Sequence, residues 1–93
     1  MKISKLLKIK GKVQGVSFRD SMRKEAHRLC VSGWVRNCKD GSVDALIQGE
    51  EILVLELLKW AKIGPSAAHV ISLEEKNMPM DASLTDFLQQ STE

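Results

Sequence analysis

A strand pattern, a glycine turn and a helix pattern follow one another near the start of the chain, and this succession limits its fold. From Leu7 to Val13, apolar residues and glycine alternate with lysines, which predicts a half-buried strand. A turn around Gly15 comes next. Apolar residues then recur at helical spacing from Phe18 to Cys30, which is typical of an amphipathic helix. The chain is therefore expected to pack helices on a sheet.

The segment from residue 11 to residue 19 has the chemistry of an anion site. Gly11 and Gly15 lie four positions apart, and glycine permits positive φ and close approach of a ligand. The N–H groups of such a turn, together with the unpaired donors of the following helix, attract anions. Arg19 adds a planar fork of donors that suits phosphate oxygens. Neither common phosphate-loop motif is present, and from these residues alone a plain turn is the favoured interpretation.

The rest of the chain supplies further strands and a second helix. Asp40-Gly41 is a strong hairpin signal between two β-prone stretches, and Gly64-Pro65 stops the second helical stripe. The elements expected after the first helix are strands at 34–37 and 43–47, a helix from about 50 to 61, a strand at 70–73, a loop at 77–83 and a short strand at 85–88.

This order predicts an α+β fold of the ferredoxin-like αβ sandwich type, β-α-β-β-α-β with a short extra strand. Such a fold has an antiparallel sheet with both helices on one face, and right-handed crossovers place the first strand inside the sheet. The length is that of a single domain over residues 1–93. Because the second helix is apolar over more than one face, we expect a monomer with a weak self-association surface.

Charge is divided unevenly along the chain. Residues 1–39 carry eleven Lys/Arg and two Asp/Glu, whereas residues 40–93 carry three Lys/Arg and ten Asp/Glu. The basic half contains the glycine turn, so an anionic ligand is expected on that side. The chain has no apolar run of about 18 residues, which argues against a membrane helix. Lys2 and Lys5 precede no long apolar segment, so we expect no signal peptide and a cytoplasmic location.

The cysteines and histidines do not predict a metal site. Cys30 and Cys38 are expected as free thiols in a chain that is not exported. With His27 and His69 they lack the spacing of zinc ligands.

Two longer stretches identify a family. Gly11 to Arg19, which reads Gly-Lys-Val-Gln-Gly-Val-Ser-Phe-Arg, resembles the first signature of the acylphosphatases. Gly33-Trp-Val-Arg-Asn37, followed by Asp40-Gly41-Ser-Val43 and Gln48-Gly49, resembles the second. Gly64-Pro65 is similar to a third, weaker one, and the spacing between Arg19 and Asn37 is similar to that of the family's two catalytic residues.

The resemblance implies an enzyme that hydrolyses the carboxyl–phosphate bond of small acyl phosphates and releases inorganic phosphate, without a metal or cofactor. Arg19 would bind the phosphoryl oxygens and Asn37 would position the attacking water.

Ser17 stands where the family often has a bulky residue, and the C-terminus lacks the family's usual terminal Tyr. The backbone that would surround the phosphate is the cradle, residues 11–17: Gly11, Lys12, Val13, Gln14, Gly15, Val16 and Ser17.

The chemistry fits these residue types. The leaving group is a carboxylate, which is stable at neutral pH and needs no general acid. Phosphoryl transfer then depends on positioning and on charge stabilisation by N–H groups and a guanidinium. On residues alone, the favoured interpretation of Asn37 is a turn residue before Asp40-Gly41. The competing functions are an idle anion-binding domain and an RNA-binding module. The second of these is disfavoured because the Lys8, Lys10 and Lys12 strand face has no interleaved aromatics.

Overall fold

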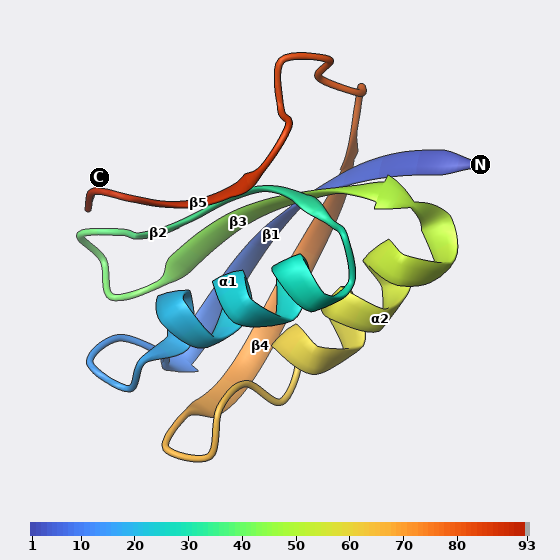
Figure 1. Ribbon diagram of the computed structural model, residues 1–93. Helices are drawn as coiled ribbons and strands as arrows, with labels where there is room; N and C mark the ends of the chain where they lie inside the picture. Colours follow the sequence, from blue (N-terminus) through green and yellow to red (C-terminus); the bar gives the residue numbers. More distant parts are fainter. Residues whose placement is uncertain (93) are drawn as a thin grey trace.

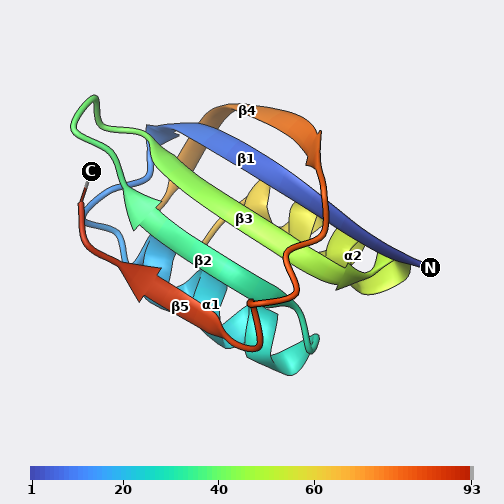
Figure 2. The same cartoon turned by 90° about the horizontal axis from the view of Figure 1, so that it is seen from above.

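The computed structural model describes residues 1–92 and shows a five-stranded sheet with both helices on one face (Figures 1 and 2). The strand order is β4-β1-β3-β2-β5. This arrangement confirms the ferredoxin-like α+β fold, including the extra strand and the internal position of the first strand. The elements are β1 (Lys2–Lys12), α1 (Phe18–Arg28), β2 (Ser32–Asn37), β3 (Val43–Glu50), α2 (Glu51–Ala61), β4 (His69–Met78) and β5 (Phe87–Gln90).

The middle strand, β3, sets the direction of its two neighbours. Both β1 and β2 pair with it in antiparallel fashion, so β1 and β2 run in the same direction and end at the same edge of the sheet. The register shows this directly, because Val43 lies opposite Ile9 of β1 on one side and opposite Asn37 of β2 on the other. The segments that follow β1 and the end of β2 are therefore neighbours in space.

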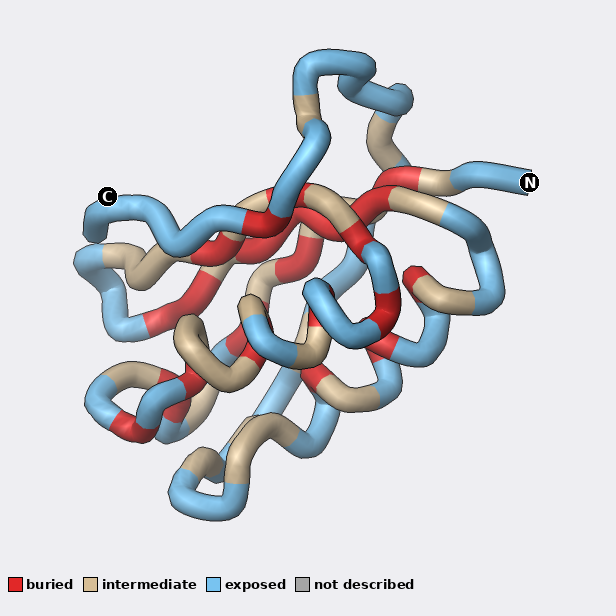
Figure 3. Tube along the Cα trace, in the orientation of Figure 1, coloured by how far each residue is buried: buried red, intermediate tan, exposed pale blue. Residues whose placement is uncertain are grey.

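The core is the layer between the sheet and the two helices (Figure 3). Leu7 and Ile9 of β1 are fully buried, as the strand alternation predicts. Phe18 and Met22 of α1 pack into the same layer, and the Phe18 ring lies 5.4 Å from the Trp60 ring of α2, centroid to centroid. Complete burial of side chains of this size contributes about 1.5–3 kcal/mol each.

The second helix, α2, buries one face and exposes part of another. Val54 and Leu58 are buried, whereas Ile52 and Leu55 are 74% and 44% exposed. This partial exposure follows from the sequence pattern of α2, which is apolar over more than one face. Within residues 1–92, no helix has the length and apolarity needed to cross a membrane.

The first four strands are longer than predicted, β1 and β4 by the most. β1 begins at Lys2 rather than Leu7, and β4 extends to Met78 although a loop was predicted from Asn77. Asn77 lies opposite Lys5, and its Oδ1 accepts a hydrogen bond from Lys5 Nζ at 2.8 Å. The long β1 thus offers a pairing partner to residues that have no strand pattern of their own.

The last strand, β5, corrects two expectations. It spans Phe87–Gln90 rather than 85–88, and it pairs with β2 in parallel, so the sheet is mixed rather than antiparallel. Met78 of β4 lies level with the start of β2 across β1 and β3, and residues 79–86 pass over the sheet face opposite the helices (Figures 1 and 2). The chain therefore arrives beside β2 in the same direction, and Gly33 N donates to Asp86 O at 2.9 Å.

Candidate active site

A pocket of about 160 Å³ opens at the sheet edge where β1 and β2 end. Arg19 and Asn37, which lie far apart in the sequence, both line it. They meet because β1 and β2 run in the same direction on either side of β3. The complete lining is Val13, Gly15, Ser17, Phe18, Arg19, Asp20, Asn37 and Gln89.

The loop between β1 and α1 bends through two left-handed residues. Gly15 has φ 71° and Ser17 has φ 63°. A Cβ atom at Gly15 would meet no other atom within 4 Å, so glycine is favoured there by its backbone conformation rather than by lack of space. Loops with left-handed residues of this kind turn successive N–H groups toward one concave side, which suits an anion.

Ser17 is also the residue before the first turn of α1, but its hydroxyl makes no capping hydrogen bond. Its carbonyl accepts the Ser21 N–H at 3.0 Å, which begins the helix. The first N–H groups of a helix have no partner within the helix itself. Without a side-chain cap, these donors can serve an anion at the positive end of the helix.

Arg19 lies on the first turn of α1 and is fixed to β5. Its NH1 donates to Gln90 O at 3.1 Å, which uses one of the five N–H groups of a guanidinium. The sequence predicted only that Arg19 lies at the start of α1. The structure shows that the last strand, β5, orients the Arg19 side chain.

Asp20 and Gln89 are pocket residues that the sequence did not reveal as such. Gln89 Nε2 donates to Asp20 Oδ1 at 3.2 Å, and the Asp20 carboxylate contacts Arg23 at 2.9 Å and Lys24 at 3.1 Å. Hydrogen bonds from Arg23 and Lys24 lower the pKa of Asp20. The position of Asp20 next to Arg19 could have identified it as a pocket residue. Gln89 could not be identified in this way, because the predicted last strand ended before it.

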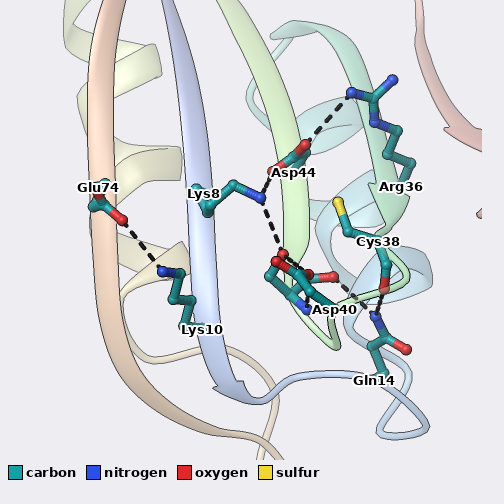
Figure 4. Close-up of polar contacts among 9 residues, drawn as sticks. Lys8, Lys10, Gln14, Arg36, Cys38, Asp40, Asp44 and Glu74 are labelled. Atoms are coloured by element: carbon teal, nitrogen blue, oxygen red, sulfur yellow. Dashed lines mark hydrogen bonds and ion pairs between the residues drawn. The ribbon is translucent and has the colours of Figure 1, made fainter. Parts of the chain in front are cut away.

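Only part of the predicted cradle faces the pocket. Gly11 and Lys12 belong to β1, and a Cβ at Gly11 would lie 2.2 Å from His69 O, so Gly11 permits close pairing with β4 rather than forming the turn. Val16 is buried in the core. The Gln14 side chain points to the turn between β2 and β3, residues 38–42, as Figure 4 shows. Val13, Gly15 and Ser17 are the cradle residues that line the pocket.

A larger hollow of about 520 Å³ lies at the opposite end of β3, where its lining includes Gln48, Met80 and Asp81. Its lining also holds a left-handed residue, Cys30, and the start of α2 at Glu50. The described lining contributes the carboxylates of Glu50 and Asp81 and no arginine, which is the reason to place the chemistry in the smaller pocket. In the described part of the chain, no three His, Cys, Asp or Glu side chains gather as a metal site would require.

Known proteins that are similar to this chain are acylphosphatases. The acylphosphatase family model matches residues 5–88. The acylphosphatase of Thiobacillus denitrificans is 61% identical over 64 residues, covering 69% of this chain and 72% of that protein. The acylphosphatase of Azoarcus sp. is 52% identical over 71 residues, covering 76% and 72%.

The fold leads to the same group. The structure of an acylphosphatase from Coxiella burnetii superposes with a TM-score of 0.91 at 32% identity, covering 96% of this chain and 93% of that one. Sequence and structure together establish that the chain belongs to the acylphosphatase family.

Proposed function

We propose that this acylphosphatase, which hydrolyses the carboxyl–phosphate bond of acyl phosphates, carries out the reaction in the pocket between residues 13–17, Arg19 and Asn37. The supporting observation is that a loop with two left-handed residues, a helix start without a side-chain cap and an arginine all border one small pocket. Each of the three favours negative charge, and a phosphoryl group is the part of the substrate that carries it.

The phosphoryl group is bound by N–H groups of the loop and of the first turn of α1, and by Arg19. The hydrogen bond from Arg19 to Gln90 O holds the guanidinium in place before substrate arrives. Such preorganised donors stabilise the transition state most where negative charge develops on the peripheral phosphoryl oxygens. The negative charge of Asp20 is offset by Arg23 and Lys24, so the pocket keeps its preference for anions.

The leaving group departs without help from an acid. Hydrogen bonds from Arg23 and Lys24 keep the pKa of Asp20 below its usual value, so Asp20 is ionised at neutral pH and has no proton to give. An acyl phosphate releases a carboxylate, which is stable as an anion at that pH. The lack of a protonated acid at Asp20 therefore suits this substrate class better than an ordinary phosphate ester, whose leaving alkoxide needs a proton.

Asn37 positions the attacking water. A carboxamide has an oxygen that accepts hydrogen bonds and an NH₂ group that donates them, so it can hold a water in a fixed direction without taking its proton. The water oxygen bonds to phosphorus as the bond from phosphorus to the acyl oxygen breaks. Its proton passes to a phosphate oxygen or to bulk water, and the products are a carboxylate and inorganic phosphate.

We further expect the protein to act as a single cytoplasmic domain, monomeric, without nucleic acid and without a metal or cofactor. Against RNA binding, the Trp34 ring on β2 already has the guanidinium of Arg36 over it, 4.7 Å from the ring centre. Stacking of a base on Trp34 would have to displace that contact.

The test is hydrolysis of benzoyl phosphate in the presence of EDTA by the wild type, Arg19→Ala and Arg28→Ala. Arg28 lies on the last turn of α1 and pairs with Glu25, so it is a matched arginine outside the pocket. We expect metal-independent turnover that Arg19→Ala lowers by at least about 10²-fold and Arg28→Ala leaves unchanged. Normal turnover by a folded Arg19→Ala would contradict the assignment of the pocket.

A further inference from the structure

We propose that the Gln14 side chain is a positioning residue that sets the location of Asn37 relative to the phosphate-binding loop. The inference rests on the proposed function of Arg19 and Asn37 and deepens it. Gln14 lies in the cradle, yet its side chain does not line the pocket. It reaches instead to the turn of residues 38–42 that directly follows Asn37 (Figure 4).

The contact consists of two hydrogen bonds from one nitrogen, which we call the Gln14 link. Gln14 Nε2 donates to Cys38 O at 2.7 Å and to Ser42 O at 2.9 Å. Both neighbours are carbonyl oxygens and can only accept, so the carboxamide must turn its NH₂ group toward them. Both N–H donors of Gln14 are thus used to join the phosphate loop to the first and last residues of the turn.

The two carbonyls are fully used only when Gln14 is present. Cys38 O also accepts the Gly41 N–H at 3.1 Å, and Ser42 O accepts the Cys38 N–H at 2.8 Å. A carbonyl oxygen has two lone pairs, and the Gln14 link supplies the second bond to each. A nonpolar side chain at position 14 would leave each of these carbonyl oxygens with one hydrogen bond instead of two.

The turn has its own internal bonds, so it is expected to move as one piece. Asp40 Oδ1 accepts the Ser42 N–H at 3.0 Å and the Ser42 hydroxyl at 2.6 Å. From outside the turn, Lys8 Nζ of β1 contacts Ser42 Oγ at 3.1 Å and Asp44 of β3 at 3.0 Å, so the sheet holds the Ser42 side of the turn (Figure 4). Loss of the Gln14 link would therefore leave the shape of the turn intact and change where the turn, and Asn37 before it, sits relative to the phosphate.

The loop that binds phosphate is held independently of this link. Val13 on one side of Gln14 and Val16 on the other are both in the core, and Phe18 anchors the start of α1. Removing the Gln14 side chain is expected to spare phosphate binding and to lower turnover, because a displacement of about 1 Å at a catalytic group costs up to about 10²-fold in rate.

The test compares Gln14→Met and Gln14→Glu with Gln48→Met. Gln48 is a matched control, since its side chain also makes two hydrogen bonds to a loop, donating to Asp81 O at 2.8 Å and accepting from Asp81 N at 3.1 Å, at the far end of β3. Glu at position 14 keeps the shape of the side chain and removes the donors. We expect Gln14→Met to lower kcat by about 10- to 100-fold, with KM and inorganic phosphate affinity nearly unchanged. Gln14→Glu should lower kcat at least as much, and its negative charge should also weaken phosphate binding. Gln48→Met should keep the wild-type kcat.

A double-mutant cycle shows whether Gln14 acts through Asn37. In an Asn37→Ala background, Gln14→Met should have little further effect on kcat, because the residue it positions is already absent. Additive losses, an unchanged kcat in Gln14→Met, or a parallel loss in Gln48→Met would each overturn the proposal.

A wild type without turnover would contradict the proposed function, and the Gln14 proposal would then be decided by NMR. We expect the Asn37 side-chain amide to respond to added inorganic phosphate in the wild type and in Gln48→Met, and to lose that response in Gln14→Met. The same response in all three proteins would overturn the Gln14 link as the element that positions Asn37.

Discussion

The two ends of β3 are held in the same way and serve different purposes. At one end Gln14 fixes the turn after β2 with two hydrogen bonds, and at the other Gln48 fixes residue 81 with two. The first joins two segments that border the pocket. The second holds residues 79–86, which lead the chain over the sheet into β5. Gln14 donates both of its hydrogen bonds, whereas Gln48 donates one and accepts one. Neither glutamine does chemistry itself, so the chemistry of each end comes from the backbone conformation and charges around it.

That difference is visible in the residues that come directly after each loop. Residues 13–17 lead into a helix start without a side-chain cap and into Arg19. Residues 79–86 lead into Phe87, a core residue at the start of a strand. Both loops end at a core phenylalanine, Phe18 or Phe87, but only the first also leads into donors that face a pocket. We therefore expect mutations at the two ends to have similar effects on stability and different effects on catalysis.

The largest effect is expected from a matched pair of core phenylalanines. Phe18 and Phe87 are the first residues after their loops and are 2% and 1% exposed. Replacement of either by Ala should lower the free energy of unfolding by about 3–5 kcal/mol, measured by urea denaturation. In the folded fraction, Phe18→Ala should lower activity more, because Phe18 is adjacent to Arg19. A loss below about 1 kcal/mol for either would contradict its place in the core.

A smaller effect is expected from Gly15→Ala, with Gly41→Ala as its control. Both glycines have positive φ, 71° and 92°, and open space around the position of a Cβ. An L-residue in the left-handed region costs roughly 1–2 kcal/mol, so both variants should lose about this much stability. Only Gly15→Ala should also weaken phosphate binding, measured by isothermal titration, since Gly15 lines the pocket and Gly41 does not. Equal loss of phosphate affinity would show that the loop conformation is not specific to binding.

The smallest effect is expected from Asp44→Asn, which removes ion pairs to Lys8 and Arg36 beside the turn. Burial alone would raise the pKa of Asp44, but hydrogen bonds from Lys8, Cys38 and Arg36 outweigh it and lower that pKa below 3.8. The carboxylate therefore stabilises the fold above pH 3.8, and this contribution is lost as the pH falls through the lower, folded-state pKa. The variant should be less stable by about 1 kcal/mol at pH 7.

The difference between the wild type and Asp44→Asn should disappear on further acidification, because the wild-type carboxyl is then protonated too. Thermal unfolding from pH 7 down to pH 2 measures it. A difference that stays constant over this range would mean that the charge of Asp44 is not what stabilises the turn.

The local patterns predicted much of the architecture from the sequence. The alternation from Leu7 to Val13 and the helical stripe from Phe18 each reflect a residue's immediate neighbours, and the structure confirms both elements. The ends of β4 and the position of β5 could not be predicted, because Asn77 and Gln90 become strand residues only by pairing with β1 and β2.

The same distinction applies to the site. Arg19 and Asn37 stood within recognisable motifs, and the structure brings them to one pocket. Gln89 and the Gln14 link depend on which loop lies next to which, and nothing in the neighbouring residues encodes that. Gly11 shows the reverse case, since its motif suggested a phosphate turn and the structure uses it for close approach of β4.

The most direct measurement is the affinity for inorganic phosphate in Arg19→Ala and Asn37→Ala, taken beside their kcat for benzoyl phosphate. Binding at the start of α1 and water positioning at the end of β2 are separate tasks in this account. We therefore expect Arg19→Ala to lose phosphate affinity, and Asn37→Ala to keep it while its kcat falls. Equal loss of phosphate affinity in both variants would contradict the division of the site between these two residues.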